Sequence, residues 1–270
     1  MPDDPKLLLD IAKKAAVEAG HKVLGVYHSG EFSHHNKDDN SPVTTADYLA
    51  NEIICERLKL ATPHIPIMSE ENANEALSVR KHWQRYWLID PIDGTKEFIV
   101  KSGHFAVNIA LIENNQPIIG VIYWPVTDTL YFASKGQGAF KHSLEESKQI
   151  RVKQLADPEQ DTITLAISRE QPVDWVMSKM STTRQYATVP LGSCSLKSCF
   201  VAEGKADLFM RIGVTGEWDT GASQCIVAEA GGKILTVNFE PLTYNQRSSL
   251  TNPNFIVTGD QRIDWRKLIL

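Results

Sequence analysis

The pattern of apolar residues changes near residue 160, and this change constrains the fold more than any other feature of the chain. Before it, the sequence predicts three antiparallel strands joined by short turns, at residues 105–112, 118–124 and 129–133. After it, strand-like runs at 163–167, 206–210 and 233–237 alternate with helical runs at 172–180, 195–203 and 220–230. Such alternation is typical of an α/β layer. We therefore expect an α+β part over residues 1–155 and an α/β part over residues 156–270.

The segment ahead of these strands predicts two helices. Asp4 followed by Pro5 is a typical helix start, and apolar residues at helical spacing continue the first helix to about residue 28. Thr44 or Thr45 can cap a second helix that carries Asp47. Residues 29–42 are polar and rich in turn formers, so we expect a mobile loop there. Short strands are expected at 65–68 and 86–89.

Composition and charge limit the classes of protein to which the chain can belong. With 270 residues, 42% of them hydrophobic and 23% charged, it has the composition of a globular protein. No apolar run reaches the roughly 18–20 residues that cross a bilayer, and the acidic N-terminus does not resemble a secretory signal. The net charge of −5 argues against a nucleic-acid partner. Four cysteines without a metal-ligand or disulfide pattern indicate a reducing, cytoplasmic setting.

Several carboxylates stand at the ends of predicted strands or the starts of predicted helices. Asp90-Pro91-Ile92-Asp93-Gly94-Thr95 follows an apolar strand across an expected turn, Glu70 ends another strand, and Asp47 and Asp219 lie near helix starts. Each acid taken singly is more typical of a turn or a helix cap. If the five converge, their repulsion requires cations, and two or three divalent ions would balance them. Oxygen ligands without imidazole or thiolate select Mg²⁺, with Mn²⁺ as a substitute.

The turn after Asp93 also suits an anion. The amides of Gly94 and Thr95, at the start of an expected helix, are placed to cradle a phosphate. Mg²⁺ in proteins usually keeps waters and shares oxygens with a phosphate, which leaves room for a nucleophilic water. The combination indicates metal-assisted hydrolysis of a phosphate ester.

Three motifs, in this order, resemble the signatures of the lithium-sensitive, magnesium-dependent phosphatase superfamily, which includes inositol monophosphatases, fructose-1,6-bisphosphatases and bisphosphate nucleotidases. They are Ser69-Glu70-Glu71, the segment 90–95, and Trp218-Asp219-Thr220-Gly221-Ala222. The resemblance covers nearly the whole chain and implies a layered α-β-α-β-α, inositol monophosphatase-like fold. Further segments are similar to the bisphosphate nucleotidase subgroup, at 40–44, 82–87, 93–98 and 192–197.

The resemblance implies a role for each matching residue. One metal ion would be held by Glu70, Asp90 and the carbonyl of Ile92, and a second by Asp90, Asp93 and Asp219, with a third, weaker ion near Glu70. Thr95, oriented by Asp47, would position the attacking water together with Glu70, and Glu71 would support the third ion or the water. The implied substrate contacts are Asp93, Gly94, Thr95, Ser193, Lys197, Arg211 and Asp219, with Arg169 as a weaker candidate.

The subgroup hydrolyses adenosine 3′,5′-bisphosphate to AMP and phosphate, and also acts on 3′-phosphoadenosine 5′-phosphosulfate. The resemblance therefore implies a nucleotide substrate, a role in sulfur metabolism and sensitivity to lithium. One departure is that Ser168-Arg169 continues with Glu170-Gln171, where the subgroup often has Ser-His and the histidine contacts the nucleotide. An inositol or other sugar monophosphate stays open as the substrate, as does a non-catalytic regulatory role. Weak association with the inner membrane and the oligomeric state are also left open.

Overall fold

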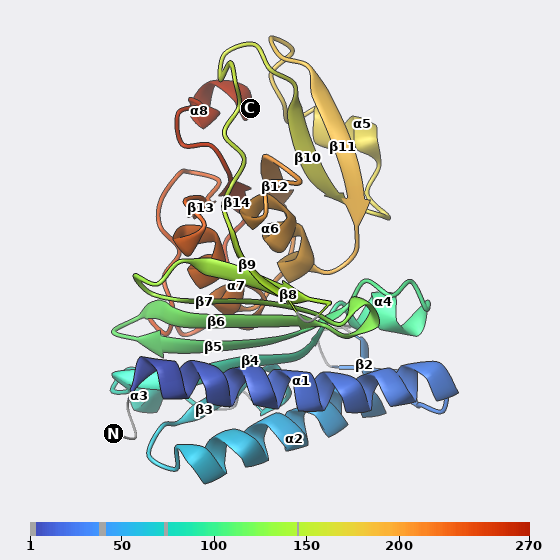
Figure 1. Ribbon diagram of the computed structural model, residues 1–270, viewed down its shortest axis with the longest axis vertical. Helices are drawn as coiled ribbons and strands as arrows, with labels where there is room; N and C mark the ends of the chain where they lie inside the picture. Colours follow the sequence, from blue (N-terminus) through green and yellow to red (C-terminus); the bar gives the residue numbers. More distant parts are fainter. Residues whose placement is uncertain (1–3, 38–41, 73–74, 145) are drawn as a thin grey trace.

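The structure is a computed structural model that describes residues 4–37, 42–72, 75–144 and 146–270. Within these ranges helices and two sheets alternate in five layers, which confirms the expected α-β-α-β-α arrangement (Figure 1). Residues 38–41, which include part of the segment 40–44 that resembles the nucleotidase subgroup, and Glu145 lie outside the described residues.

Two long helices form the first layer, close to where the sequence predicts them. Helix α1 (Pro5–Ser29) is capped by Asp4, whose side chain accepts a hydrogen bond from the Lys6 amide. Helix α2 (Thr45–Ala61) is capped by Thr44. Their apolar faces pack on one face of the larger sheet in a cluster of fully buried side chains. This layer supports the sheet from the face opposite the helices that pack between the two sheets.

The larger sheet is seven-stranded within the described residues. Its order is β3 (Ile67–Ser69), β4 (Arg85–Asp93), β5 (Ala106–Glu113), β6 (Gln116–Trp124), β7 (Thr129–Ser134), β8 (Ala139–Ser143) and β9 (Glu146–Ile150). Strands β3 and β4 are parallel and the remaining neighbours are antiparallel. The three predicted antiparallel strands correspond to β5–β7. The charged residues 146–148 are exposed and form the edge strand β9, which the sequence does not predict because these polar residues lack the apolar alternation that marks a strand.

Strand β4 corrects the expected turn between Asp90 and Asp93. The strand continues through Pro91 to Asp93, and its pairing with β5 shifts register between the two acids. Pro91 has no amide to donate to the ladder, so a bulge accommodates it. The chain turns at Gly94, which has φ 95°, and a Cβ there would lie 3.1 Å from the His104 carbonyl. Helix α4 (Thr95–Ile99) follows at once.

The segment 29–42 is not a plain loop. Residues His34–Asn36 form β1, which pairs antiparallel with β2 (Pro42–Thr44). All three residues of β1 are exposed. Because the strand has no buried face, its sequence shows no alternation of apolar and polar residues. Three short pieces connect the first half of the chain: η1 (Glu70–Asn72), α3 (Leu77–Arg80) and η2 (Pro125–Thr127).

Helices α6 (Cys194–Ala202) and α7 (Glu217–Glu229) form the middle layer between the two sheets. The smaller sheet, five-stranded within the described ranges, has the order β11 (Tyr186–Leu191), β10 (Ile163–Ser168), β12 (Leu208–Arg211), β14 (Phe255–Thr258) and β13 (Lys233–Thr236). Its outer face packs on α5 (Val173–Met177) and α8 (Trp265–Leu268). Helix α5 is shorter than the predicted 172–180, and α7 begins three residues before the predicted 220.

The two sheets lie on either side of residues 155 and 156, where the sequence divides the chain. Helix α7 nevertheless comes from the second part and packs against strands β4–β8 of the first. The division at this point stays a prediction. What matters for the site is that α7 carries its N-terminus to the end of β4.

Candidate metal and phosphate site

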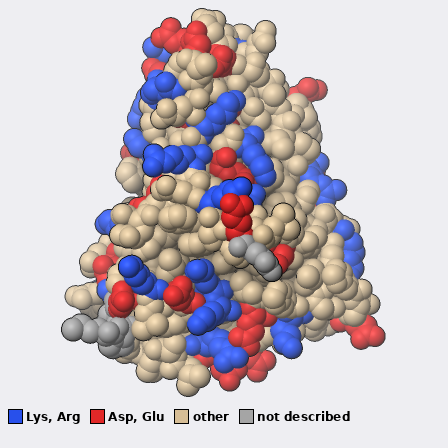
Figure 2. Space-filling model, in the orientation of Figure 1, with Lys and Arg blue, Asp and Glu red and all other residues tan. Residues whose placement is uncertain are grey.

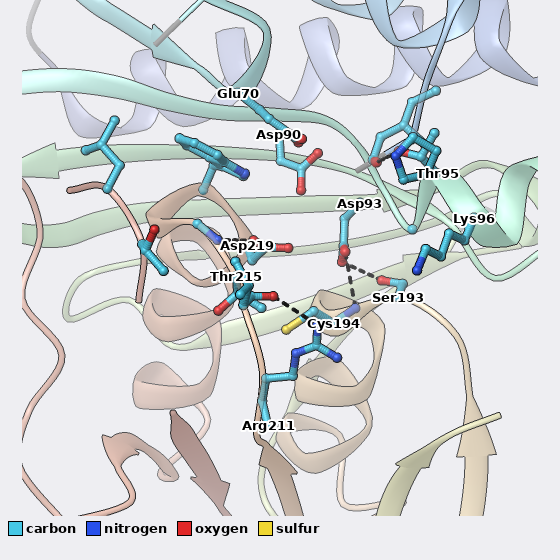
Figure 3. A pocket seen from close by; sticks show the side chains of 18 of the residues that line it. Glu70, Asp90, Asp93, Thr95, Lys96, Ser193, Cys194, Arg211, Thr215 and Asp219 are labelled. Atoms are coloured by element: carbon cyan, nitrogen blue, oxygen red, sulfur yellow. Dashed lines mark hydrogen bonds between the residues drawn. The ribbon is translucent and has the colours of Figure 1, made fainter. Parts of the chain in front are cut away.

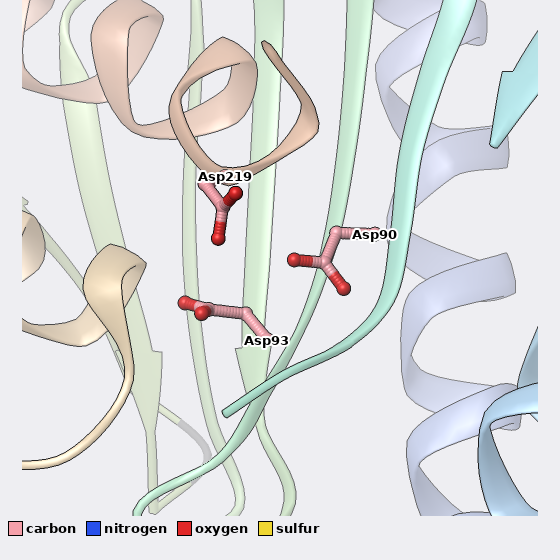
Figure 4. A group of neighbouring side chains, drawn as sticks. All are labelled: Asp90, Asp93 and Asp219. Carbon is pink, nitrogen blue, oxygen red and sulfur yellow. The ribbon is translucent and has the colours of Figure 1, made fainter. Parts of the chain in front are cut away.

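Three carboxylates meet where β4 ends and α7 begins. One oxygen from each of Asp90, Asp93 and Asp219 lies within 4.8 Å of the other two (Figure 4). Asp90 and Asp93 are 1% and 4% exposed, and Asp219 is partly buried. The predicted convergence of these three acids is therefore present in the fold, although they come from segments 126 residues apart (219 − 93 = 126).

Asp219 is fixed by the first turn of α7. It is the third residue of that helix, and its Oδ2 accepts a hydrogen bond from the Gly216 amide at 2.6 Å. An acid in this position satisfies one of the free amides at a helix start and is stabilised by the helix dipole. The bond uses one oxygen and leaves the other, Oδ1, for the cluster.

Asp93 is held by the turn that starts α6. Its Oδ2 accepts hydrogen bonds from the Ser193 hydroxyl at 2.5 Å, the Ser195 hydroxyl at 2.5 Å and the Ser195 amide at 2.7 Å, and its Oδ1 accepts one from the Cys194 amide at 3.2 Å (Figure 3). Sequence reasoning placed Ser193 at the substrate and missed Ser195. A serine two positions further on carries no motif, so only the fold brings it to Asp93.

Asp90 has the opposite surroundings. Among the described residues, no group donates a hydrogen bond to its Oδ1, although the atom is buried. Burial, followed by the charges of Glu70 and Asp93, raises the pKa of Asp90 well above its usual value. Burial and Asp93 raise the pKa of Asp219 in the same way. A buried oxygen without a donor, beside two further acids, fits a bound cation, and oxygen ligands fit a hard divalent ion.

Glu70 and Glu71 lie beside this cluster and share a lysine. Lys37 donates from Nζ to Glu70 Oε1 at 2.9 Å and to Glu71 Oε1 at 2.7 Å. Burial raises the pKa of each of these glutamates, and Lys37 opposes that rise. Burial acts to lower the pKa of Lys37, but the two glutamates outweigh it and raise that pKa. Sequence reasoning missed Lys37, because a lone lysine in a polar segment gives no signal.

Thr95 connects the cluster to Asp47. Its hydroxyl lies 3.1 Å from Asp47 Oδ1 and 3.2 Å from the Ile92 carbonyl, and both atoms are acceptors for its proton. Asp47 Oδ2 accepts hydrogen bonds from the amide and the hydroxyl of Thr44, at 2.8 and 2.6 Å. Burial raises the pKa of Asp47 to about 6. The pairing of Thr95 with Asp47 that the resemblance implied is thus present as a hydrogen bond.

A cavity of about 1030 Å³ opens in front of the three aspartates. Most of the predicted residues line it: Glu70, Asp90, Ile92, Asp93, Gly94, Thr95, Ser193, Lys197, Arg211 and Asp219. Glu170 also lines it, whereas Asp47, Glu71 and Arg169 do not. Asp47 and Glu71 lie behind the wall, where they contact Thr95 and Lys37.

The cations predicted to bind substrate differ in how free they are. Lys197 is 4% exposed and donates to the carbonyls of residues 191, 192 and 193, at 3.3, 3.2 and 2.6 Å. Arg169 forms an ion pair with Glu97 at 2.8 Å. Arg211 donates from Nη2 to the Val214 carbonyl at 3.0 Å, and its buried Nε has no partner among the described residues. Their substrate contacts stay predictions.

The layered fold and the acidic cluster define a class of protein with a candidate metal site beside a large open cavity. The chain belongs to the inositol monophosphatase family, whose sequence profile matches residues 4–262. It is 38% identical over 262 residues to the protein named 3′(2′),5′-bisphosphate nucleotidase CysQ of Aggregatibacter actinomycetemcomitans, covering 97% of this chain and 96% of the relative. The protein of the same name from Escherichia coli K12 is 41% identical, with coverage of 93% and 99%.

Solved structures support the same placement. The crystal structure of CysQ from Bacteroides thetaiotaomicron is 36% identical, with a TM-score of 0.77 and coverage of 93% of this chain and 96% of that chain. The Thermotoga maritima IMPase is 27% identical, with a TM-score of 0.74 and coverage of 93% and 91%. Within the described residues, none of the helices combines the length and apolar character needed to span a bilayer. The face in Figure 2 intersperses basic and acidic side chains.

Proposed function

We propose that this protein is a Mg²⁺-dependent phosphatase that hydrolyses the 3′-phosphate of adenosine 3′,5′-bisphosphate to give AMP and phosphate, and also acts on 3′-phosphoadenosine 5′-phosphosulfate. The observation that carries the proposal is the meeting of Asp90, Asp93 and Asp219 beside the hydrogen-bonded Thr95–Asp47 pair. The nucleotide substrate is supported by relatives about 40% identical over nearly the whole chain, which bear the nucleotidase name. Removal of this by-product of sulfate activation would take place in the cytoplasm.

The donor set suits two or three Mg²⁺ ions, with Mn²⁺ as a substitute. Glu70, Asp90 and the Ile92 carbonyl would hold one ion, and Asp90, Asp93 and Asp219 a second. When bound, such ions make a water molecule more acidic and neutralise the charge of the phosphate. Glu70 and Glu71 both accept a hydrogen bond from Lys37, and Glu71 would support a third ion or its water.

The chain's own residues orient the attacking water. The Thr95 proton is directed at Asp47 Oδ1 and the Ile92 carbonyl, so the lone pairs of the Thr95 hydroxyl can accept a hydrogen bond from water in the cavity. Asp47 is fixed by two bonds from Thr44 and cannot swing away. The water oxygen bonds to phosphorus as the bond to the ribose 3′-oxygen breaks, and one proton of the water ends on that oxygen, so that the sugar regains its hydroxyl. Gly94 and Ser193 line the cavity where the phosphate would lie.

Glu170 is the observation that keeps an inositol or other sugar monophosphate as a second candidate substrate. It lines the cavity, and its charge would oppose a second phosphate placed near it. Arg211 lines the same cavity and supplies the opposite charge. Which substrate is preferred depends on which of these groups faces the second anion.

The test is phosphate release from adenosine 3′,5′-bisphosphate and from inositol 1-phosphate, each titrated with MgCl₂. We expect the bisphosphate to be hydrolysed much faster, with a rate that depends on Mg²⁺. The Asp93→Asn variant is the matched control for the metal site and should lose both activities. Faster turnover of inositol 1-phosphate would assign the protein to sugar phosphates. If the protein hydrolyses neither substrate and Asp93→Asn retains its biological effect, a non-catalytic role is favoured.

A further inference from the structure

Few cations of the cavity wall are free to meet a substrate. Among the described residues, those that line it are Arg80, Lys96, Lys197 and Arg211. Arg80 is 1% exposed and is bonded to the side chain of Asn245 and to backbone carbonyls, so it holds the fold together. The Lys197 ammonium donates hydrogen bonds to three carbonyls of the turn that positions Ser193. Both are interior groups whose hydrogen bonds are already made.

Lys96 differs from Arg80 and Lys197 in its exposure and in its hydrogen bonds. It is exposed, and among the described residues no acid or carbonyl pairs with its ammonium. Figure 3 shows the side chain reaching from α4 toward the cavity, with its nitrogen directed at the side where Asp93 and Ser193 lie. Its neighbour Glu97 is tied to Arg169 at 2.8 Å, so the nearest acid in the sequence is already paired with another cation.

The charges of the cavity wall indicate which anionic group Lys96 would bind. The acids Asp90, Asp93 and Asp219 gather at one place, where metal ions would neutralise the phosphate that reacts. A bisphosphate carries a second anionic group that lies away from those ions and needs a cation of its own. Because the Lys197 ammonium already bonds to three carbonyls, Lys96 and Arg211 are, among the described residues that line the cavity, the two cations whose donors are not all used within the protein.

We propose that Lys96 binds the second anionic group of the substrate, and so determines the preference for a bisphosphate over a monophosphate. The proposal rests on the proposed function and names the residue that sets its specificity. Lys96 follows Thr95 directly, so the α4 turn would present the water-positioning hydroxyl and the specificity cation to two different phosphates of one molecule. An ammonium on a flexible stem can adapt to either a phosphate or a phosphosulfate.

The test compares adenosine 3′,5′-bisphosphate with adenosine 3′-monophosphate, which has the same reacting phosphate and lacks only the second one. For Lys96→Ala, the ratio of kcat/KM for the bisphosphate to kcat/KM for the monophosphate should fall about tenfold, mainly through KM. Lys96→Arg should restore most of that ratio. Lys22→Ala removes an exposed lysine of α1 outside the cavity and should keep the wild-type ratio.

Product inhibition provides a second readout. AMP retains the second phosphate, so its inhibition constant should rise about tenfold in Lys96→Ala, whereas the constant for inorganic phosphate should stay close to wild type. Equal losses for both substrates would overturn the proposal and assign Lys96 to the reacting phosphate. An unchanged ratio would overturn it in favour of Arg211. If the wild-type protein hydrolyses neither nucleotide, it is the proposed function that fails, and the dissociation constants of AMP and of phosphate, measured by direct binding to wild type and Lys96→Ala, still report where Lys96 acts.

Discussion

Asp90 and Asp93 lie three positions apart on one strand, yet their surroundings are opposite. Asp93 accepts hydrogen bonds from two hydroxyls and two amides of the 193–195 turn, so its charge is compensated by the protein. Asp90 has a buried oxygen without a donor among the described residues. We interpret Asp93 as the acid whose position is fixed in advance and Asp90 as the acid whose charge is compensated only by a cation. The bonds to Asp93 should therefore set the affinity for metal.

This interpretation predicts the effect of removing one hydroxyl. Ser195→Ala deletes a donor 2.5 Å from Asp93 Oδ2 and leaves the amide of the same residue in place. We expect the Mg²⁺ concentration for half-maximal activity to rise about tenfold, because partners that orient a ligand typically contribute this much to metal affinity. Ser198→Ala is the matched control, since that buried hydroxyl bonds to the Cys194 carbonyl one helical turn away. If the Mg²⁺ concentration for half-maximal activity rises by a similar factor in both variants, the cause is a disturbance of helix α6 and not the loss of the hydrogen bond to Asp93.

Thr95 and Asp47 should behave as one unit. Thr95→Val keeps the shape and loses the hydroxyl, and we expect kcat/KM to fall on the order of 100-fold, the low end for a group that positions a transferred proton. Asp47→Asn should cause a similar loss, because the one oxygen of the amide is needed by the two donors of Thr44, and an NH₂ group, which cannot accept, then faces the Thr95 hydroxyl. The double variant should be no worse than the poorer single one. Losses that multiply in the double variant would show that the two residues act separately.

At the scale of elements, the site depends on how closely α7 lies on the larger sheet. Gly120 of β6 faces the Ala222 carbonyl of α7, and a Cβ at residue 120 would lie 2.2 Å from that oxygen. Gly221 of α7 packs on the same sheet, where a Cβ would lie 2.9 Å from Leu88 Cδ2. An alanine at residue 221 therefore needs a side chain to move, whereas one at residue 120 needs backbone to move. The close contact at Gly120 keeps Asp219 beside β4.

Gly120→Ala should consequently separate α7 from the sheet. We expect the free energy of unfolding to fall by more than about 2 kcal/mol, toward the upper part of the range for overpacking, because the clash is with backbone. Chemical denaturation measures it, and the Mg²⁺ requirement should rise together with the loss. Gly25→Ala is the control: a Cβ there meets no atom within 4 Å, and the change should stabilise α1 by up to about 1 kcal/mol. Full stability in Gly120→Ala would mean that α7 has room to move.

The elements that the sequence predicts well are those with one buried face. Helices α1 and α2 and strands β5–β7 carry periodic apolar residues, so their positions could be predicted to within a few residues. Strands β1 and β9 are short and largely exposed and β8 is mostly half-buried, so their residues follow no clear pattern. The acids of the site could be predicted from ordered motifs. Ser195 and Lys37 could not, because each acts through a contact made only in the folded chain.

The whole molecule brings acids from distant segments into one buried place, and this has a cost. Burial raises the pKa values of Asp90 and Asp219 well above normal and that of Asp47 to about 6. An acid whose pKa is higher in the folded protein than in the unfolded chain makes the fold less stable as the pH rises between the two values. For Asp47 that window runs from 3.8 to about 6. The metal-free protein should therefore lose stability as the pH rises through this range.

Metal removal should expose this cost in a pH-dependent manner. At a Mg²⁺ concentration about 100 times Kd, binding adds about 2.7 kcal/mol to the free energy of unfolding, and the gain should be greater at pH 7.5 than at pH 5, where protons compete for the same oxygens. Thermal unfolding with EDTA or with MgCl₂ at the two pH values measures it. Asp90→Asn removes one charge from the cluster, so its metal-free form should be more stable than wild type at pH 7.5 and gain little from Mg²⁺. Asp10→Asn, at an exposed site on α1, should respond as wild type does. A metal-free Asp90→Asn protein less stable than wild type would mean that hydrogen bonds, and not cations, compensate the charge of Asp90.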